Sequence, residues 1–586
     1  MQRDNQAADK SNVHFRVRVL YVAVVVVAAV FLVRLFYLQV IRFDHYRTLA
    51  IQGQLKEYQI DPQRGRIKAH DGNAVVPIVL NEKKYTLFAD PAFVRDKRDA
   101  AHKIQRIIGG DVGEYEEKMN EDTRYAVLKK KLSKEQKEQI DELEIKGIGT
   151  REAEYRTYPQ GEMAAQLLGF VNDEGEGRYG VEQYLDGRLR GRPGQLKAIT
   201  DARGVPLVSS KDNIIVEPES GEDVILTIDI SMQKQLEETL KAGLERARSA
   251  SGSAVIMEAD TGAVKAMANF PTYNPSEFFN VEDASVFNNA VVSEPLEVGS
   301  VMKPLTAAAA LNQGAVNRNS TFYDPSRLVV DTETVSNIEE DGGPGTKSVA
   351  DILQLSLNTG ATWLLMQMGG GTINEQARMT WHGYMTERYG FGYQTGIEQG
   401  YEADGYVPDP MDGFGLNIQY ANTSFGQGMS ATPLQMAAAL SSIVNGGTYY
   451  RPRLVDAYVT PDGTEHIVQP DVVRRGVVSP EVSQVMVELM EYTARRNRYT
   501  TPLDNYLIGG KTGTAQITRP EGGYFEDRYN GTFVGFVGGD RPQYVIVVRV
   551  NDPGIPGYAG SQAAAPVFGN IVNALVDSLM VHPKSN

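Results

Sequence analysis

Cysteine is absent from the 586 residues of this chain, and histidine occurs only seven times. The first absence excludes disulfides, thiolate catalysis and cysteine-ligated metal sites. No two histidines have a metal-ligand spacing such as H-E-x-x-H, so a histidine-based hydrolase or a zinc site is not expected. The net charge of -15 gives no support for nucleic-acid binding.

One long apolar run lies near the N-terminus. It is unbroken from Val19 to Val33, is interrupted by Arg34 and continues to Ile41. The 23 residues from Val19 to Ile41 would form roughly 35 Å of helix, which is enough to span a membrane. A cleaved signal peptide is the alternative, but no small-x-small site follows the apolar core, which favours a permanent anchor.

The charges that precede this run predict its orientation. Basic residues outnumber acidic ones there, and cytoplasmic flanks of membrane spans are enriched in basic residues. We therefore expect a cytoplasmic tail over residues 1–14, a transmembrane anchor over 15–41 and an extracytoplasmic body. The charged residues are Arg3, Lys10, Arg16 and Arg18, against Asp4 and Asp9.

Residues 42–217 are predicted to form a folded spacer with no catalytic pattern. The stretch 96–147 is highly charged and is predicted to be helical. Within it, Ser133 and Gln136 form a capping-box pattern ahead of a helix that reaches Leu143.

From residue 218 to 582 the pattern changes to one of strands at both ends with helices between them. This order predicts an α+β domain rather than alternating βαβ units. The predicted strands are GEDVILTIDI, a hairpin in SGSAVIMEADTGAVKAMANF, LIGGKTGTAQI, GTFVGFVGG and PQYVIVVRV. The predicted helices are SMQKQLEETLKAGLERA and the runs 300–312, 350–368, 433–445 and 562–580.

Two Ser-x-x-Lys sequences occur in the chain. The first, Ser231 to Lys234, opens the predicted helix with leucines at steps of four. We interpret it as a solvated first turn in which Ser231 caps the helix.

The second sequence, Ser300 to Lys303, opens the apolar run LTAAAAL. A serine and a lysine three residues apart share a helix face. A serine at a helix N-terminus meets unpaired N–H groups, which would stabilise a developing oxyanion. Pro304 is tolerated there because first-turn N–H groups need no partner within the helix. A buried Lys303 could then act as a base toward Ser300.

Two further elements follow in order. Ser356-Leu357-Asn358 is the only S-x-N in the chain, and Lys511-Thr512-Gly513 is the only K-T-G. The second lies in a predicted strand, where Lys511 and Thr512 point to opposite faces. Gly513 would let another backbone approach closely.

The order S-x-x-K, S-x-N, K-T-G resembles the penicillin-binding proteins and serine β-lactamases. The anchor, R-G-R-I from Arg64, GRYGVEQYLDGRL, D-A-R-G from Asp201 and SFGQGMSATPLQMAAALSSIVNGG are similar to a class B penicillin-binding protein. That family is one of monofunctional D,D-transpeptidases of division or elongation. Val298 departs from it, because proline usually precedes the Gly-Ser of this segment, and we expect a looser turn there.

The resemblance implies a fold and a set of roles. The fold is a transpeptidase domain on an elongated pedestal with one transmembrane helix. Ser300 would be the acylated nucleophile, with Lys303 as its base. Ser356 and Asn358 would line the opposite wall, as proton relay and amide contact. Lys511 would bind the substrate carboxylate, Thr512, Gly513 and Thr514 would contact substrate, and the N–H groups of Ser300 and Thr514 would form the oxyanion hole.

The resemblance also implies ligands and partners. The substrates would be peptidoglycan stem peptides ending in D-Ala-D-Ala, and β-lactams would bind the same serine. No cofactor or metal is expected. A SEDS-family membrane polymerase and proteins of the divisome or elongasome would be partners. Two alternatives stay open: a hydrolase of the same superfamily, either a D,D-carboxypeptidase or a β-lactamase, and a non-catalytic scaffold or β-lactam sensor.

Overall fold

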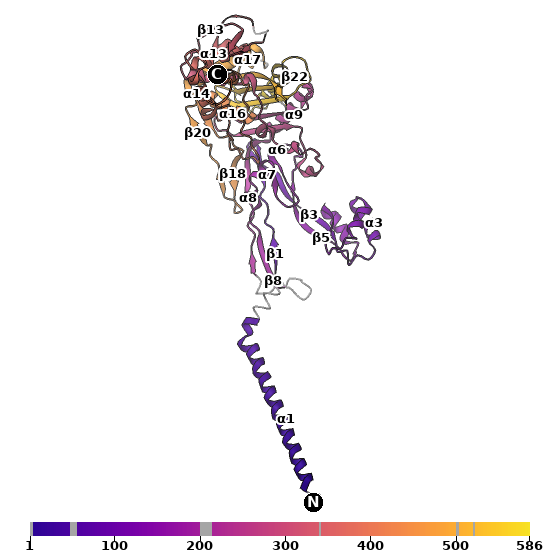
Figure 1. The fold of residues 1–586 in the computed structure, drawn as a ribbon. Helices are drawn as coiled ribbons and strands as arrows, with labels where there is room; N and C mark the ends of the chain where they lie inside the picture. The colour runs from indigo at the N-terminus through magenta and orange to yellow at the C-terminus, as the bar shows by residue number, and fades with distance from the viewer. Residues whose placement is uncertain are drawn as a thin grey trace. The chain divides into compact units, whose positions relative to one another are not determined.

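The computed structural model describes residues 4–46, 55–199, 214–338, 342–499, 503–519 and 522–585. The D-A-R-G sequence from Asp201 lies outside these ranges. The chain divides into two compact units, one of residues 1–62 and 191–220 and the other of residues 63–190 and 221–586. Figure 1 traces both along the colour bar.

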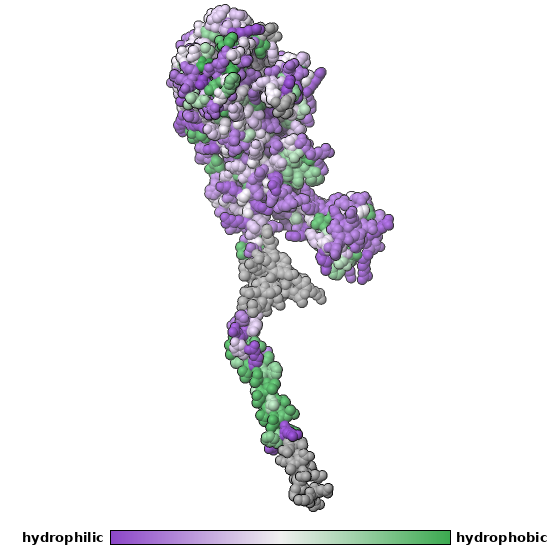
Figure 2. All heavy atoms as spheres, viewed as in Figure 1, coloured by the Kyte–Doolittle hydropathy of each residue, from purple (hydrophilic) through white to green (hydrophobic). Residues whose placement is uncertain are grey.

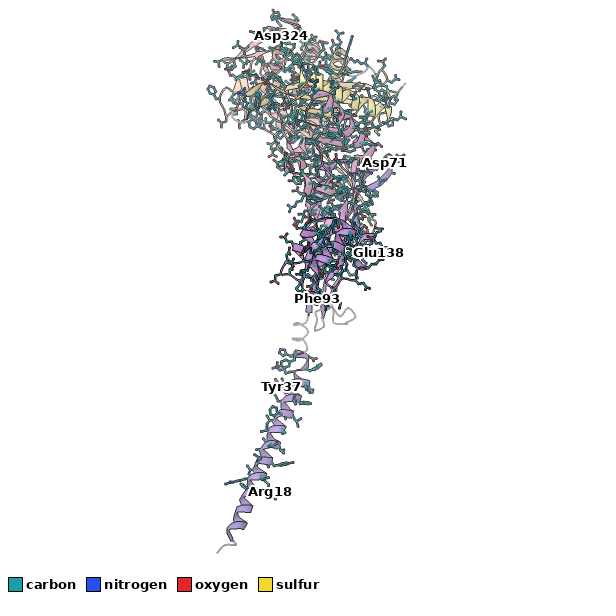
Figure 3. The ribbon with its side chains drawn as sticks, turned by 90° about the vertical axis from the view of Figure 1, so that its right-hand side faces the viewer. Arg18, Tyr37, Asp71, Phe93, Glu138 and Asp324 are labelled. Carbon is teal, nitrogen blue, oxygen red and sulfur yellow. The ribbon has the colours of Figure 1, made fainter. Side chains whose placement is uncertain are left out.

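The first unit contains the apolar helix. Helix α1 (Asp4–Phe36) continues into a π-helical turn, η1 (Tyr37–Ile41). Within the described residues, Phe15–Ile41 is the one stretch that is long and apolar enough to cross a membrane. Figure 2 shows apolar side chains along it, and Figure 3 labels Arg18 and Tyr37 near its two ends. By length and composition this stretch fits the predicted transmembrane anchor over residues 15–41.

A small antiparallel sheet completes the first unit. Its strands lie in the order β1-β8-β9, so two segments far apart in sequence pair with the chain that follows the helix. The strands are β1 (Leu55–Ile60), β8 (Gly194–Ile199) and β9 (Ile214–Val216).

The N-terminal part of the second unit carries a lobe with its own apolar core (Figure 1). The long strand β3 (Ala74–Ala89) pairs with β5 (Ile148–Thr157) and β4 (Ala126–Leu132). Figure 3 labels Phe93 and Glu138 in this lobe. Its helices are α3 (Lys97–Ile108), α4 (Val112–Lys118) and α5 (Lys134–Asp141).

The predicted helical stretch 96–147 is therefore partly wrong. Strand β4 interrupts it, because Ala126, Leu128 and Leu132 are buried in the lobe while Lys130 and Lys131 are exposed. The capping box is confirmed, since Ser133 and Gln136 exchange hydrogen bonds at the start of α5. The helix ends before Leu143.

A buried ion cluster joins two of the quoted sequences of the second unit. Glu182, from GRYGVEQYLDGRL, pairs with Arg64, of R-G-R-I, at 2.5 Å and with Arg156 at 2.6 Å. The Glu182 side chain is fully buried, so these two arginines neutralise a charge that water does not reach. The short elements nearby are α6 (Ala165–Leu168), β6 (Phe170–Val171), β7 (Gly177–Arg178), α7 (Gly180–Tyr184) and α8 (Asp186–Arg190).

Residues 221–585 contain the predicted α+β arrangement. A five-stranded antiparallel sheet has the order β12-β11-β23-β22-β21, which brings the K-T-G strand β21 to one edge. Alternate residues face two apolar cores, with Val255 and Val547 in one and Ala254 and Val548 in the other. The strands are β11 (Ser251–Glu258), β12 (Val264–Phe270), β21 (Leu507–Thr518), β22 (Tyr524–Gly538) and β23 (Pro542–Asn551).

A second sheet joins both parts of this unit. Its order is β19-β18-β10-β2-β3-β4, with β5 on β3. The strands not yet bounded are β2 (Ile67–Asp71), β10 (Asp223–Asp229), β18 (Val455–Val459) and β19 (Glu465–Ile467). Short two-stranded pairs are β13 (Thr321–Asp324) with β16 (Gly345–Ser348), β14 (Arg327–Val330) with β15 (Glu333–Ser336), and β17 (Thr448–Tyr450) with β20 (Val472–Arg475).

Helices pack against the five-stranded sheet and next to its edge strand β21. Those between β10 and β16 are α9 (Ile230–Ala247), η2 (Pro275–Asn280), η3 (Ala284–Phe287), α10 (Ala290–Ser293), η4 (Gly299–Met302) and α11 (Lys303–Asn312). The later ones are α12 (Val349–Gln354), α13 (Asn358–Met368), α14 (Glu375–Gly383), η5 (Tyr384–Arg388), α15 (Leu416–Ser424), α16 (Pro433–Val444), α17 (Pro480–Asn497), η6 (Gly560–Ala564) and α18 (Ala565–Asp577).

Two details of these helices differ from the predictions. The N-cap of α9 is Asp229, whose carboxylate accepts the Met232 N–H at 2.9 Å, so Ser231, which is the second residue of the helix, is not the cap. The predicted helix 350–368 is two helices, α12 and α13, separated at Leu355–Leu357.

Candidate active site

Ser300 lies in the 3₁₀ turn η4, directly before helix α11. A 3₁₀ turn has three residues per turn, so residues i and i+3 stand one above the other. Lys303 is fully buried, and its Nζ donates to Ser300 Oγ at 2.9 Å. The local backbone therefore brings the amine of Lys303 against the hydroxyl of Ser300.

The turn before Ser300 is fixed by its neighbours. Gly299 has a left-handed φ of 65°, and its N–H donates to the Gly426 carbonyl at 3.0 Å. The Thr532 hydroxyl donates to the Val298 carbonyl at 3.0 Å. The expected loosening at Val298 is therefore offset by two hydrogen bonds from other segments.

Ser356 lies at the break between α12 and α13. Its φ of 60° is unusual for a residue with a side chain, and such backbone strain collects at functional sites. Lys303 Nζ donates both to the Ser356 carbonyl, at 2.5 Å, and to Ser356 Oγ, at 3.1 Å. Asn358 opens α13 and donates its Nδ2 to the Ser336 carbonyl at 3.0 Å.

Strand β21, which carries K-T-G, packs against the turn that holds Ser300 at the position of Gly513. A Cβ on Gly513 would lie 2.7 Å from the Val298 carbonyl oxygen and 3.0 Å from Val301 Cγ1. Only a residue without a side chain lets β21 pack so closely against η4, as predicted for Gly513. Lys511 is also buried, and its Nζ donates to the Thr512 carbonyl at 2.9 Å.

The remaining predicted residues lie along β21. The Thr514 backbone nitrogen lies 3.4 Å from the position that a Cβ would take on Gly299, next to Ser300. Thr514 Oγ1 accepts the Gly560 N–H at 3.0 Å, and Thr512 Oγ1 is 3.1 Å from the Tyr499 hydroxyl. Both hydroxyls have protein partners, and their contacts with substrate stay predictions.

Family models match most of this chain. The penicillin binding protein transpeptidase domain matches residues 252–573, and the penicillin-binding protein dimerisation domain matches residues 59–226. Stage V sporulation protein D of Bacillus subtilis is 31% identical over 589 residues, covering 98% of this chain and 88% of that protein.

The chain belongs to the class B penicillin-binding proteins. As a member of this family it is an enzyme, a peptidoglycan transpeptidase of cell-wall synthesis. The predictions of family, fold class and enzyme class are confirmed.

Two further similarities agree with this membership. Peptidoglycan D,D-transpeptidase FtsI of Escherichia coli strain K12 is 27% identical over 99% of this chain and 95% of that protein. The crystal structure of penicillin binding protein 2X from Streptococcus thermophilus covers 90% of this chain and 80% of that chain, with a TM-score of 0.72 at 22% identity. At this identity the second similarity establishes the fold alone.

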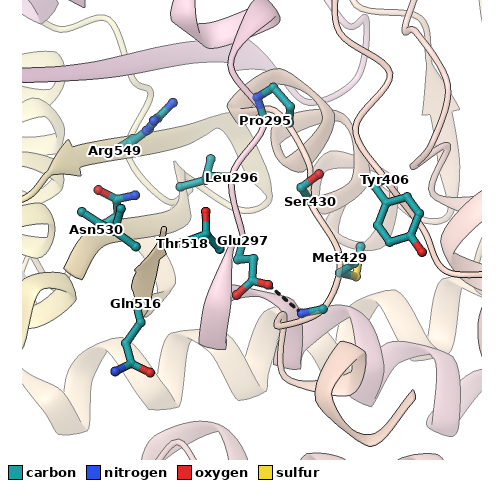
Figure 4. A pocket seen from close by; sticks show the side chains of 12 residues that line it. Pro295, Leu296, Glu297, Tyr406, Met429, Ser430, Gln516, Thr518, Asn530 and Arg549 are labelled. Atoms are coloured by element: carbon teal, nitrogen blue, oxygen red, sulfur yellow. Dashed lines mark hydrogen bonds between the residues drawn. The ribbon is translucent and has the colours of Figure 1, made fainter. Parts of the chain in front are cut away.

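This penicillin-binding protein has a cavity of about 570 Å³ that sequence reasoning did not find (Figure 4). It lies between the segment before Ser300, the end of β21 and the residues after Gly426. Its lining residues are Pro295, Leu296, Glu297, Tyr406, Gly428, Met429, Ser430, Gln516, Ile517, Thr518, Asn530 and Arg549.

Glu297 is the carboxylate of this cavity. It accepts the Gly428 N–H at 2.9 Å, drawn as a dashed line in Figure 4, and the Tyr524 hydroxyl at 2.9 Å. Burial raises the pKa of Glu297, although both hydrogen bonds act to lower it. A carboxyl three residues before Ser300 was visible in the sequence, but its partners lie 131 and 227 residues away.

Proposed function

We propose that this enzyme crosslinks stem peptides through an acyl-enzyme on Ser300. The supporting observation is that Lys303 Nζ lies 2.9 Å from Ser300 Oγ and 3.1 Å from Ser356 Oγ. One buried amine thus touches both hydroxyls that a two-step acyl transfer needs. Histidine is not required in such a network, because lysine takes the role of imidazole.

Acylation begins with attack by Ser300 Oγ on the carbonyl carbon between the two terminal D-alanines. The serine proton passes to the amine of Lys303, and the oxyanion is held by the N–H groups of Ser300 and Thr514. The C–N bond then breaks, and the Ser356 hydroxyl relays a proton to the leaving amine. Free D-alanine departs, and an ester to Ser300 remains.

The second half-reaction forms the crosslink. The amine of a neighbouring stem peptide attacks the ester carbonyl carbon, the C–O bond to Ser300 breaks as the amide C–N bond forms, and a proton from the amine passes to Ser300 Oγ. Lys511, Thr512, Gly513 and Thr514 bind the terminal carboxylate and backbone of the donor peptide. Asn358 contacts its amide from the opposite wall.

The same chemistry makes this enzyme a target of β-lactams. Opening of the lactam ring acylates Ser300 with no leaving group to depart, so the adduct persists. The donor peptide and the antibiotic both carry a carboxylate next to the scissile amide, which Lys511 can attract in either case.

The apolar helix supports a location at the membrane, and the family resemblance supports a set of partners. Basic residues such as Arg16 and Arg18 before the span support a cytoplasmic N-terminus and an extracytoplasmic catalytic region. Stem peptides occur outside the cytoplasmic membrane. The enzyme acts there with a SEDS-family polymerase and proteins of the divisome or elongasome, in septal or lateral wall synthesis.

Fluorescent penicillin tests this function directly. Wild type and Ser231→Ala should be labelled equally, whereas Ser300→Ala should show no labelling above background. Since Ser231 belongs to the other Ser-x-x-Lys sequence, it is a matched control. Persistent labelling of Ser300→Ala would refute the nucleophile, and rapid loss of label from the wild type would identify a hydrolase instead.

A further inference from the structure

A chain of hydrogen bonds links the segment before Ser356 to the K-T-G strand. It runs from Gln354, at the end of α12, through Asn497, at the end of α17, and Tyr499 to Thr512. Asn497 and Tyr499 belong to none of the three motifs. The distances are 2.9 Å from Asn497 Nδ2 to the Gln354 carbonyl, 2.8 Å from Nδ2 to the Tyr499 hydroxyl and 3.1 Å from that hydroxyl to Thr512 Oγ1.

The chemistry of these groups favours one direction for each hydrogen bond. The backbone carbonyl of Gln354 can only accept, so the Asn497 side-chain nitrogen faces it. The Asn497 side-chain oxygen accepts from the Gln354 side chain, whose Nε2 lies 3.3 Å away. The second hydrogen of the same nitrogen is donated to the Tyr499 oxygen. Among the described partners of the Tyr499 hydroxyl, Thr512 Oγ1 is the remaining acceptor for the phenol proton, so the arrangement that leaves no donor unused has Tyr499 donating to Thr512.

Thr512 Oγ1 is thereby occupied as an acceptor. It accepts from Tyr499, and Lys511 Nζ lies 3.4 Å away as a second donor. Among the described residues these are its hydrogen-bond partners, and neither is an acceptor for the threonine proton once Tyr499 donates. The proton of Thr512 is left to be donated to a ligand, beside the ammonium of Lys511.

Burial supports this arrangement of protons. Burial raises the pKa of the Tyr499 phenol, which keeps its proton available for donation. Its ring packs edge-to-face on Phe533, with centroids 5.3 Å apart, so the hydroxyl is held in place from the ring side.

We propose that Asn497 and Tyr499 are positioning residues that orient the Thr512 hydroxyl as a donor to the terminal carboxylate of the substrate. This inference rests on the proposed function, in which Lys511 binds that carboxylate. A second consequence is that the Asn497 side-chain amide, through Tyr499, links the segment before Ser356 to the K-T-G strand.

The test compares a ligand that carries the carboxylate with one that lacks it. Acylation efficiency is measured with benzylpenicillin and with its methyl ester, on wild type, Tyr499→Phe and Tyr492→Phe. Tyr492 is the matched control, because it lies on α17 with its side chain exposed. We expect Tyr499→Phe to lose about tenfold in efficiency toward the acid and little toward the ester, since one hydrogen bond to a charged group is lost. Tyr492→Phe should keep the wild-type acylation efficiency with both the acid and the ester.

A merely structural role for Tyr499 predicts a different pattern. In that case Tyr499→Phe would lower the fraction of folded enzyme, or would slow acylation by the acid and by the ester equally. Either result would overturn the inference. Asn497→Asp gives a second test if Tyr499→Phe does not fold. The introduced carboxylate would accept the Tyr499 proton and turn it away from Thr512, so preference for the acid should again fall.

The inference and the proposed function fail in different ways. If wild type itself does not prefer the acid to the ester, the carboxylate site at Lys511 is refuted and the inference with it. If wild type prefers the acid and Tyr499→Phe keeps the full preference, the inference alone is refuted.

Discussion

The two Ser-x-x-Lys sequences of this chain have the same spacing and different surroundings. Lys234 has 69% of its side chain exposed and lies 4.0 Å from the Glu238 carboxylate, one turn along α9. Lys303 has no exposed area and donates to two serines of different segments. Spacing alone puts a serine and a lysine on one face, whereas burial and converging neighbours provide the setting for chemistry.

The largest expected difference comes from removing each lysine. Lys303→Met should lower the acylation rate with penicillin by roughly 10²–10⁴-fold, because it removes the group that we propose takes the serine proton. Lys234→Met, on the solvated face of α9, should leave the rate unchanged. Stopped-flow acylation measures both, and thermal unfolding checks that both variants fold. Equal rates for the two variants would remove the distinction between the two sites.

A glycine pair tests how tightly the turn before Ser300 is fixed. Gly299 and Gly314 have nearly equal φ values, 65° and 66°, but a Cβ on Gly299 would lie 2.9 Å from the Thr514 carbonyl oxygen, and one on Gly314 would meet open space. Alanine at either position costs about 1–2 kcal/mol for the left-handed backbone.

Gly299→Ala should therefore lower the unfolding temperature more than Gly314→Ala does. It should also slow acylation by about tenfold, because displacement of the nucleophile by a fraction of an ångström impairs attack. Gly314→Ala should acylate like wild type. If both variants acylate normally, the contact between η4 and β21 does not position Ser300.

The smallest expected effect is a pH dependence at Glu297. Burial raises the pKa of this carboxyl above its ordinary value of 4.5, so the folded state binds its proton more tightly than the unfolded state does. Ionised Glu297 thus costs stability, and the cost grows as pH rises above 4.5 toward the folded-state pKa.

Glu297→Gln removes this titration and keeps an oxygen for the Gly428 N–H. The variant should gain unfolding temperature relative to wild type as pH is raised from about 4.5 to 7. A difference between the two proteins that stays constant over this range would contradict a raised pKa.

Much of the catalytic fold could be predicted because local patterns carry it. The leucines at steps of four in α9 have the period of a buried helix face, and the continuous apolar runs in β11, β22 and β23 are typical of strands that are buried on both faces. The three motifs could be predicted to converge because they occur in the order typical of one enzyme family, although S-x-x-K alone occurs twice in the chain. Structure adds that Lys303 links Ser300 and Ser356 directly.

The errors and omissions have a common physical origin in tertiary contacts. The break between α12 and α13 places the carbonyl and the hydroxyl of Ser356 against Lys303 Nζ, and no local period shows this contact between distant segments. Strand β4 is rich in lysine and lies in a stretch for which the sequence predicts a helix. It forms a strand because its pairing with β3 overrides the local preference. Ser231 lost the capping role to Asp229, two residues earlier.

The most direct test of the central claim is peptide mapping of the penicillin adduct by mass spectrometry. The full-length enzyme is treated with benzylpenicillin, denatured and digested, and the modified serine is identified by fragmentation. The account predicts a penicilloyl ester on Ser300 and none on Ser231 or Ser356. An adduct on either of those serines with Ser300 unmodified would contradict it.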